Sequence, residues 1–161
     1  MTYSVLFVCM GNICRSPTAD GVFKKKLLLA GLAKEVRVDS AGTHNYHPGS
    51  PPDQRSQSHA YLRGYDLSSL RARQIREADY AKFDLILAMD WDNLALLQDD
   101  CPPAYQHKLR RLTEFCLTQE AAVVPDPYFG GPAGFDAVLD LVEDACEGLL
   151  GHVRHQIASG N

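Results

Sequence analysis

The chain has 161 residues, of which 45% are hydrophobic, and it carries a formal net charge of −4 at pH 7. A chain of this length can bury one core, so we expect a single domain over residues 1–161. The negative charge argues against nucleic acid or an anionic membrane as a partner, and no apolar run approaches the roughly 20 residues that span a bilayer.

The first predicted element is a strand at Val5–Val8, a short apolar run followed at once by a loop that contains glycine. The next apolar residues recur at helical spacing, which predicts a helix over residues 17–30. We expect Ser16 to be the N-cap of this helix, with Pro17 in its first turn and Gly31 at its exit.

The rest of the chain continues the alternation of strands and helices. The predicted segments are a strand over Glu35–Ser40, a helix over Asp53–Arg63 ended by Gly64, a short helix over Glu77–Phe83, a strand over Leu85–Met89, a short helix over Asp90–Leu97, a strand over Lys108–Leu112, a loop over Val123–Pro132 and a long helix over Phe135–Ile157. This order predicts an α/β fold with a parallel sheet and helices on both faces. Ligands bind beyond the carboxyl ends of such strands, where Cys9, Ser40 and Asp90 stand.

The loop Cys9–Ser16 shows the chemistry that this edge of the sheet supports. A strand, a glycine-containing loop and a helix together form a phosphate-binding arrangement, because backbone N–H groups line the loop and the helix dipole points at its contents. The N–H groups and Arg15 favour the thiolate form of Cys9, and a planar guanidinium also binds phosphate through two hydrogen bonds. The pattern indicates nucleophilic attack by Cys9 on phosphorus, without a metal or other cofactor.

Such a reaction needs an acid, because an alkoxide or phenoxide leaves poorly. None of the six histidines stands in a compelling context, and His44 and His47 merely lie in a loop. Asp126 is the better candidate, since Pro125 and Pro127 restrict the backbone on either side of it. We therefore predict that Asp126 is the general acid.

The C-x5-R-S order of Cys9–Ser16 and the string Asp126-Pro127-Tyr128 resemble the motifs of the low-molecular-weight protein tyrosine phosphatases. The resemblance covers essentially the whole chain. It implies a three-layer sandwich with four parallel strands in the order 2-1-3-4. It also implies a hydrolase that acts on phosphotyrosine-containing proteins through a phosphocysteine intermediate. We expect a monomer in the cytoplasm, where the five cysteines stay reduced, since the N-terminus lacks a signal-peptide pattern.

The resemblance also assigns roles to individual residues. Asn12 resembles the residue that braces the loop, Ser40 its partner, and Ser16 the hydroxyl that supports the thiolate. The other predicted phosphate-site residues are Met10, Gly11, Ile13 and Cys14. The aromatic residues that resemble the walls around a substrate ring are Tyr46, Tyr128 and Phe129.

Three alternatives remain open from the sequence. An arsenate reductase on this scaffold needs two relay cysteines, for which Cys101 and Cys116 are the available pair. A phosphoarginine phosphatase tends to carry Thr where Ile13 stands. A phosphopeptide-binding module without activity needs neither the thiol nor the acid.

Cys14 suggests a further hypothesis. It follows Cys9 by five residues on a loop that must curl around an anion, and the thiolate of such a site is a target of peroxide. A nearby second thiol can trap the oxidised sulfur as a disulfide, so Cys9 and Cys14 are a candidate redox pair.

Overall fold

The structure is a computed structural model that describes residues 2–160. Its four strands are β1 (Tyr3–Cys9), β2 (Val36–Gly42), β3 (Leu85–Ala88) and β4 (Leu109–Arg111). They pair in parallel in the order β2-β1-β3-β4, which confirms the expected topology.

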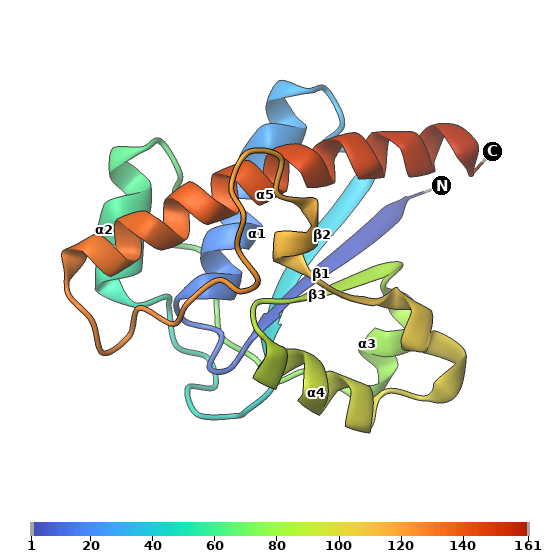
Figure 1. The fold of residues 1–161 in the computed structure, drawn as a ribbon, viewed down its shortest axis with the longest axis horizontal. Helices are drawn as coiled ribbons and strands as arrows, with labels where there is room; N and C mark the ends of the chain where they lie inside the picture. Colours follow the sequence, from blue (N-terminus) through green and yellow to red (C-terminus); the bar gives the residue numbers. More distant parts are fainter. Residues whose placement is uncertain (1, 161) are drawn as a thin grey trace.

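Helices cover both faces of this sheet (Figure 1). They are α1 (Arg15–Leu29), α2 (Gln54–Leu62), α3 (Glu77–Lys82), α4 (Trp91–Asp100) and α5 (Pro132–Ser159), with two short 3₁₀ helices, η1 (Pro103–Lys108) and η2 (Leu112–Phe115). Figure 1 shows α1 and α5 on one side of the sheet, α3 and α4 on the other, and α2 beside the first half of α5. The three-layer α/β prediction is therefore confirmed.

The alternation of β1 explains why both faces are covered. Successive side chains of a strand point to opposite faces, and all of β1 from Ser4 onwards is buried. Val5 and Phe7 pack in the core cluster with α1 and α5, whereas Leu6 and Val8 pack in the cluster that contains residues of α3 and α4. A strand buried on both faces reads as the continuous apolar run that the sequence displays.

Most helix boundaries follow their sequence signals. Gly31 and Gly64 have φ values of 74° and 91°, which ends α1 and α2 as expected. Asp53 caps α2 by accepting a hydrogen bond from the backbone N–H of Arg55 at 2.8 Å. Pro132, expected in the preceding loop, is instead the first residue of α5, a position where its missing N–H has no intrahelical role.

The prediction that Ser16 caps α1 is wrong. The helix begins at Arg15, its N-cap is Cys14, and no side chain caps it. Ser16 lies inside the first turn, and its hydroxyl oxygen is 3.0 Å from the sulfur of Cys9. The Ser16 hydroxyl therefore contacts the side chain of Cys9, beside the neighbouring loop, instead of capping α1.

The sheet register brings the carboxyl ends of three strands to one edge. Cys9 of β1 pairs with Gly42 of β2, and Val8 pairs with Ala88 of β3. The loops that follow these strands therefore meet beside Cys9. Within residues 2–160, no helix is both long and apolar enough to cross a membrane.

Candidate active site

Residues 10–14 form a tight loop between β1 and α1, and Asn12 determines its shape. Asn12 has a φ of 60°, a left-handed conformation that Asn adopts more readily than most residues. Its backbone N–H consequently turns inward and donates to the Cys9 sulfur at 3.3 Å. Its side-chain oxygen accepts from the N–H of Arg73 at 3.0 Å, which holds the amide in this orientation.

The side-chain nitrogen of Asn12 connects two buried hydroxyl groups. It donates to Ser16 Oγ at 2.8 Å and to Ser40 Oγ at 3.0 Å. The Ser16 hydroxyl oxygen lies 3.0 Å from the Cys9 sulfur and 3.4 Å from the Ala41 carbonyl oxygen, so its hydrogen can be donated to either. The Cys9 sulfur thus accepts from the Asn12 N–H and has the Ser16 hydroxyl as a second neighbour that can donate to it.

The end of β2 holds the outer side of the loop. Thr43 donates its N–H to the Cys9 carbonyl at 2.8 Å, and His44 donates to the Met10 carbonyl at 3.0 Å. Gly42 permits this approach, because a Cβ at that position would lie 2.7 Å from the Met10 carbonyl oxygen. The loop is therefore braced by β2 as well as by Asn12.

Arg15 is buried, with 1% of its surface exposed, and its guanidinium is held from two sides. One terminal nitrogen donates to Asp90 Oδ2 at 2.5 Å and to the Val124 carbonyl at 3.0 Å. The other oxygen of Asp90 accepts from the N–H of Asn93 at 2.7 Å and caps α4. Asp90 thus connects Arg15 to the start of α4, a role that sequence reasoning missed although it placed Asp90 at the correct edge.

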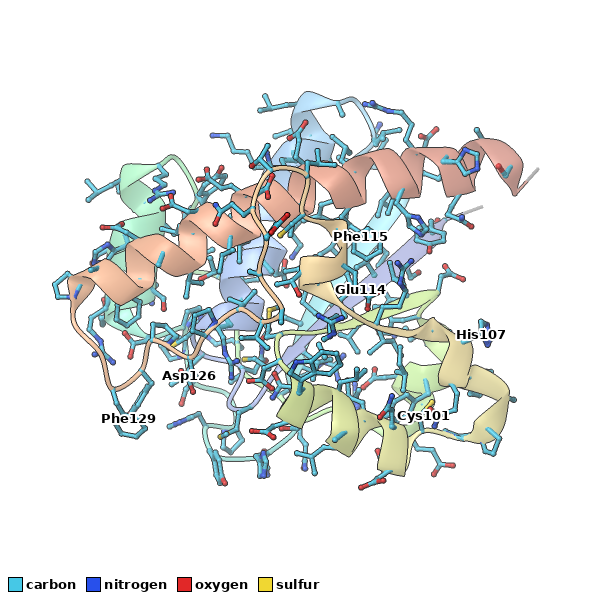
Figure 2. All side chains as sticks on the ribbon, in the orientation of Figure 1. Cys101, His107, Glu114, Phe115, Asp126 and Phe129 are labelled. Atoms are coloured by element: carbon cyan, nitrogen blue, oxygen red, sulfur yellow. The ribbon has the colours of Figure 1, made fainter. Side chains whose placement is uncertain are left out.

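Asp126 lies on the loop that leads into α5 (Figure 2). One carboxylate oxygen accepts from the Tyr128 N–H at 3.1 Å, forming an Asx turn, while the other is 3.8 Å from the second terminal nitrogen of Arg15. The start of this loop is tied to β3, since Val124 donates its N–H to the Met89 carbonyl at 2.8 Å. The Asp126 carboxylate therefore faces the Arg15 guanidinium, which directly follows the loop of residues 10–14, here called the phosphate loop.

The thiol, the guanidinium and the carboxylate open onto one cavity of about 230 Å³. Its lining residues are Cys9, Met10, Gly11, Ile13, Cys14, Arg15, Tyr46, His47, Asp126, Tyr128 and Phe129. The other predicted site residues (Asn12, Ser16 and Ser40) are buried and act through the loop. His47 is a lining residue that the sequence did not single out; a Cβ on Gly11 would lie 3.2 Å from its ring.

Aromatic side chains form part of the cavity wall. The ring of Tyr46 stacks on His44 with centroids 4.8 Å apart. Tyr128 and Phe129 contact each other edge to face at 4.9 Å, and Phe129 is 94% exposed. Tyr46, Tyr128 and the exposed Phe129 thus all line the one cavity.

Cys14 also lines the cavity and is buried like Cys9, with 5% and 3% of their surfaces exposed, but it is Cys9 that accepts the Asn12 N–H. Burial raises the pKa of the Cys14 thiol to about 12. Cys14 is therefore a thiol rather than a thiolate near neutral pH. Among residues 2–160, no group of three or more His, Cys, Asp or Glu side chains is arranged to hold a metal ion.

Sequence and structure comparisons identify the class of protein. The sequence model of the family described as low molecular weight phosphotyrosine protein phosphatase matches residues 4–159. A low molecular weight protein-tyrosine-phosphatase of Streptomyces coelicolor is 41% identical over 160 residues, which is 98% of this chain and 97% of that protein. The human low molecular weight phosphotyrosine protein phosphatase is 40% identical over 151 residues, covering 92% of this chain and 94% of the human one.

A solved structure agrees with these relatives. A crystal structure of a protein tyrosine phosphatase from Entamoeba histolytica superposes with a TM-score of 0.92, at 42% identity, over 99% of both chains. The fold and the sequence therefore define a protein tyrosine phosphatase. The chain belongs to the low molecular weight phosphotyrosine protein phosphatase family and is a hydrolase.

Proposed function

We propose that the chain hydrolyses phosphotyrosine through a phosphocysteine intermediate on Cys9. The sulfur attacks phosphorus in line, an S–P bond forms, and the P–O ester bond breaks with its electron pair on the phenolic oxygen. The hydrogen bonds from Asn12 and Ser16 support this role, because they stabilise the thiolate before attack and the departing sulfur afterwards.

Arg15 and the backbone N–H groups of the loop hold the equatorial oxygens of the transferred phosphoryl group. Charge spreads over these oxygens in the transition state, so donors that are already in position lower the barrier. Asp90 supports this role by fixing one side of the guanidinium, which leaves the second terminal nitrogen directed toward Asp126 and the cavity.

Asp126 protonates the leaving phenoxide in the first step. As a carboxylate it then removes a proton from the water that attacks the phosphocysteine, which regenerates the Cys9 thiolate and releases phosphate. The observation that carries the proposal is that Cys9, Arg15 and Asp126 line one cavity, with Asp126 3.8 Å from Arg15, although Asp126 stands far from the other two in the sequence.

The aromatic lining favours an aryl phosphate. Tyr46 and Tyr128 provide apolar surfaces beside the phosphate loop, and stacking contributes about 0.5–1.5 kcal/mol per well-placed aromatic pair beyond the buried area. Phosphoserine has no ring to make this contact. Ile13 adds another apolar contact, which suits a phenyl ring better than a phosphorylated guanidinium.

The proposal extends to the domain organisation, oligomeric state, location and partners of the enzyme. We expect residues 1–161 to act as one phosphatase domain, as a monomer in the cytoplasm, without a cofactor and without nucleic acid or a membrane as partner. The net charge of −4 supports the last point. The five cysteines are all free, in keeping with a reducing compartment.

We also propose that peroxide inactivates the enzyme reversibly. The Cys9 thiolate attacks one oxygen of hydrogen peroxide, giving a sulfenic acid and, after protonation, water. The Cys14 thiol then attacks the sulfenic sulfur, forming a disulfide and releasing a second water. Cys9 and Cys14 line the same cavity, which supports the pairing.

The replacement Asp126→Asn tests the proposed acid. Phenyl phosphates with poor leaving groups should lose far more kcat than p-nitrophenyl phosphate, because only poor leaving groups need the proton. p-Nitrophenyl phosphate is the internal control, because its hydrolysis depends on Cys9 and Arg15 but not on the acid. Equal slowing across the series would remove Asp126 from the acid step.

A further inference from the structure

The first turn of α2 lies between the phosphate loop and the loop that carries Asp126. Asp53, the N-cap of α2, donates its backbone N–H to the Ile13 carbonyl at 2.8 Å. Two residues later, a terminal nitrogen of Arg55 donates to the Tyr128 carbonyl at 2.9 Å. One short segment, residues 53–55, therefore contacts both halves of the proposed active site, through the backbone of Asp53 and the side chain of Arg55.

The guanidinium of Arg55 is held in one geometry. Its Nε donates to Asp53 Oδ1 at 3.1 Å and a terminal nitrogen donates to Asp53 Oδ2 at 2.9 Å, the two-pronged pairing that fixes both orientation and distance. The group also lies over two aromatic rings, 5.5 Å from the centroid of Tyr128 and 4.7 Å from that of Phe135. Arg55 thus contacts the backbone and the ring of Tyr128 together.

The position of Asp126 depends on how firmly this loop is held. Its carboxylate is 41% exposed, and it bonds to the N–H of Tyr128, the residue whose carbonyl Arg55 holds. Another hydrogen bond of the loop is also local, from the Gly130 N–H to the Pro127 carbonyl. Val124, two residues before Asp126, bonds to Met89 and Arg15, whereas after Asp126 the bond from Arg55 to the Tyr128 carbonyl ties the loop to α2.

We propose that the Asp53–Arg55 pair is a latch that ties the acid loop, the segment of residues 123–131 that carries Asp126, to the phosphate loop, with Arg55 as a positioning residue for Asp126. The inference rests on the proposed role of Asp126 as the acid. A misplacement of about 1 Å can slow a reaction on the order of a hundredfold, so a loosened loop should weaken proton transfer well before it affects phosphate binding. Arg55 itself does not line the cavity.

The test compares Arg55→Ala and Arg55→Lys with a matched control, Arg63→Ala. Arg63 stands at the other end of α2 and pairs with Asp140 and Glu143 of α5, so its loss removes ion pairs without touching the acid loop. Arg55→Ala should lower kcat roughly tenfold or more for phenyl phosphates with poor leaving groups and only a few-fold for p-nitrophenyl phosphate. Arg55→Lys should recover little, because lysine lacks the planar fork.

Two further readouts separate a latch from a general structural role. The inhibition constant of inorganic phosphate should be unchanged in Arg55→Ala, since the phosphate loop is intact. In an Asp126→Asn background, the additional replacement Arg55→Ala should cause no further loss that depends on the leaving group. The control Arg63→Ala should lower the unfolding midpoint but keep the leaving-group dependence of the wild type.

The outcomes distinguish the latch from the function on which it rests. Three results would overturn the latch while leaving Asp126 as the acid. They are a loss of kcat in Arg55→Ala that is equal for good and poor leaving groups, a change in KM with kcat unchanged, and a further loss that depends on the leaving group when Arg55→Ala is added to Asp126→Asn. If Asp126→Asn itself slowed good and poor leaving groups equally, both the acid assignment and the latch would be wrong.

Discussion

The ion pair between Arg15 and Asp90 leads to a quantitative prediction for Asp90→Asn. The side chain of Arg15 is 2% exposed and that of Asp90 23% exposed, so this is a mostly buried pair with a 2.5 Å contact. Asparagine can still accept from the N–H of Asn93 and cap α4. The substitution therefore removes the negative charge beside Arg15 and leaves the helix cap in place.

Removing one partner of a buried ion pair destabilises a protein by about 3–5 kcal/mol, because the remaining charge is uncompensated. The partial exposure of Asp90 and the bond from Arg15 to the Val124 carbonyl put the expected loss near the lower end, about 3 kcal/mol. For a chain of this size the unfolding midpoint falls by roughly 2–4 °C per kcal/mol, so we expect a decrease of about 6–12 °C.

Urea and thermal unfolding in a buffer free of phosphate measure this loss, and Asp92→Asn, an exposed position in the same helix, is the matched control. Inorganic phosphate should restore part of the stability of Asp90→Asn, because the anion compensates the charge of Arg15. An Asp90→Asn variant within about 1 kcal/mol of the wild type would refute the argument that Asp90 neutralises and orients Arg15.

Arg15→Lys keeps the charge but loses the planar fork, so kcat/KM for p-nitrophenyl phosphate should fall on the order of 10²–10³-fold; a change of only a few-fold would show that Arg15 is not a phosphate ligand. Because burial raises the pKa of Cys14 to about 12, iodoacetamide at pH 7 should label Cys9 and not Cys14, as peptide mapping would reveal. Peroxide should give a Cys9–Cys14 disulfide that thiols reverse, and its absence by mass spectrometry from reversibly inactivated enzyme would exclude the redox pair. Burial acts to raise the pKa of Asp79, but the hydrogen bonds from Arg73 and from the Arg76 N–H, together with the charges of both arginines, outweigh burial and hold that pKa below its ordinary value. This carboxylate therefore stabilises the fold above the unfolded-state pKa of about 3.9, and the advantage over Asp79→Asn in urea should shrink as the pH falls below about 4; a constant difference from pH 7 to pH 3 would contradict it.

The topology was predictable because local signals agreed along the chain. The apolar run at Val5–Val8, the positive-φ glycines after α1 and α2, and the Asp53 cap all gave the expected boundaries. Cys9, Arg15 and Asp126 were predictable as candidates, because the C-x5-R-S spacing and the prolines on either side of Asp126 can be read directly from the sequence.

The supporting contacts were not predictable, because they depend on which loops meet in space. Nothing near Arg15 in the sequence points to Asp90, and its pairing exists because parallel β1 and β3 end side by side. The contact between Arg55 and Tyr128 likewise depends on the packing of α2 against α5. Ser16 was misassigned because a hydroxyl at a helix start can either cap the helix or turn to a neighbouring group, and the Cys9 sulfur determines the choice.

The central claim is that the phosphoryl group passes through Cys9. The Asp126→Asn enzyme is the appropriate form for the test, because p-nitrophenyl phosphate needs no acid to react, whereas breakdown of the intermediate lacks its base. Acid quenching within the first turnover, followed by mass spectrometry of the peptide that contains Cys9, measures the intermediate directly. We predict one phosphoryl group on Cys9 and none in Cys9→Ser; steady turnover with no phosphorylated Cys9, or with the phosphoryl group on another residue, would contradict the account.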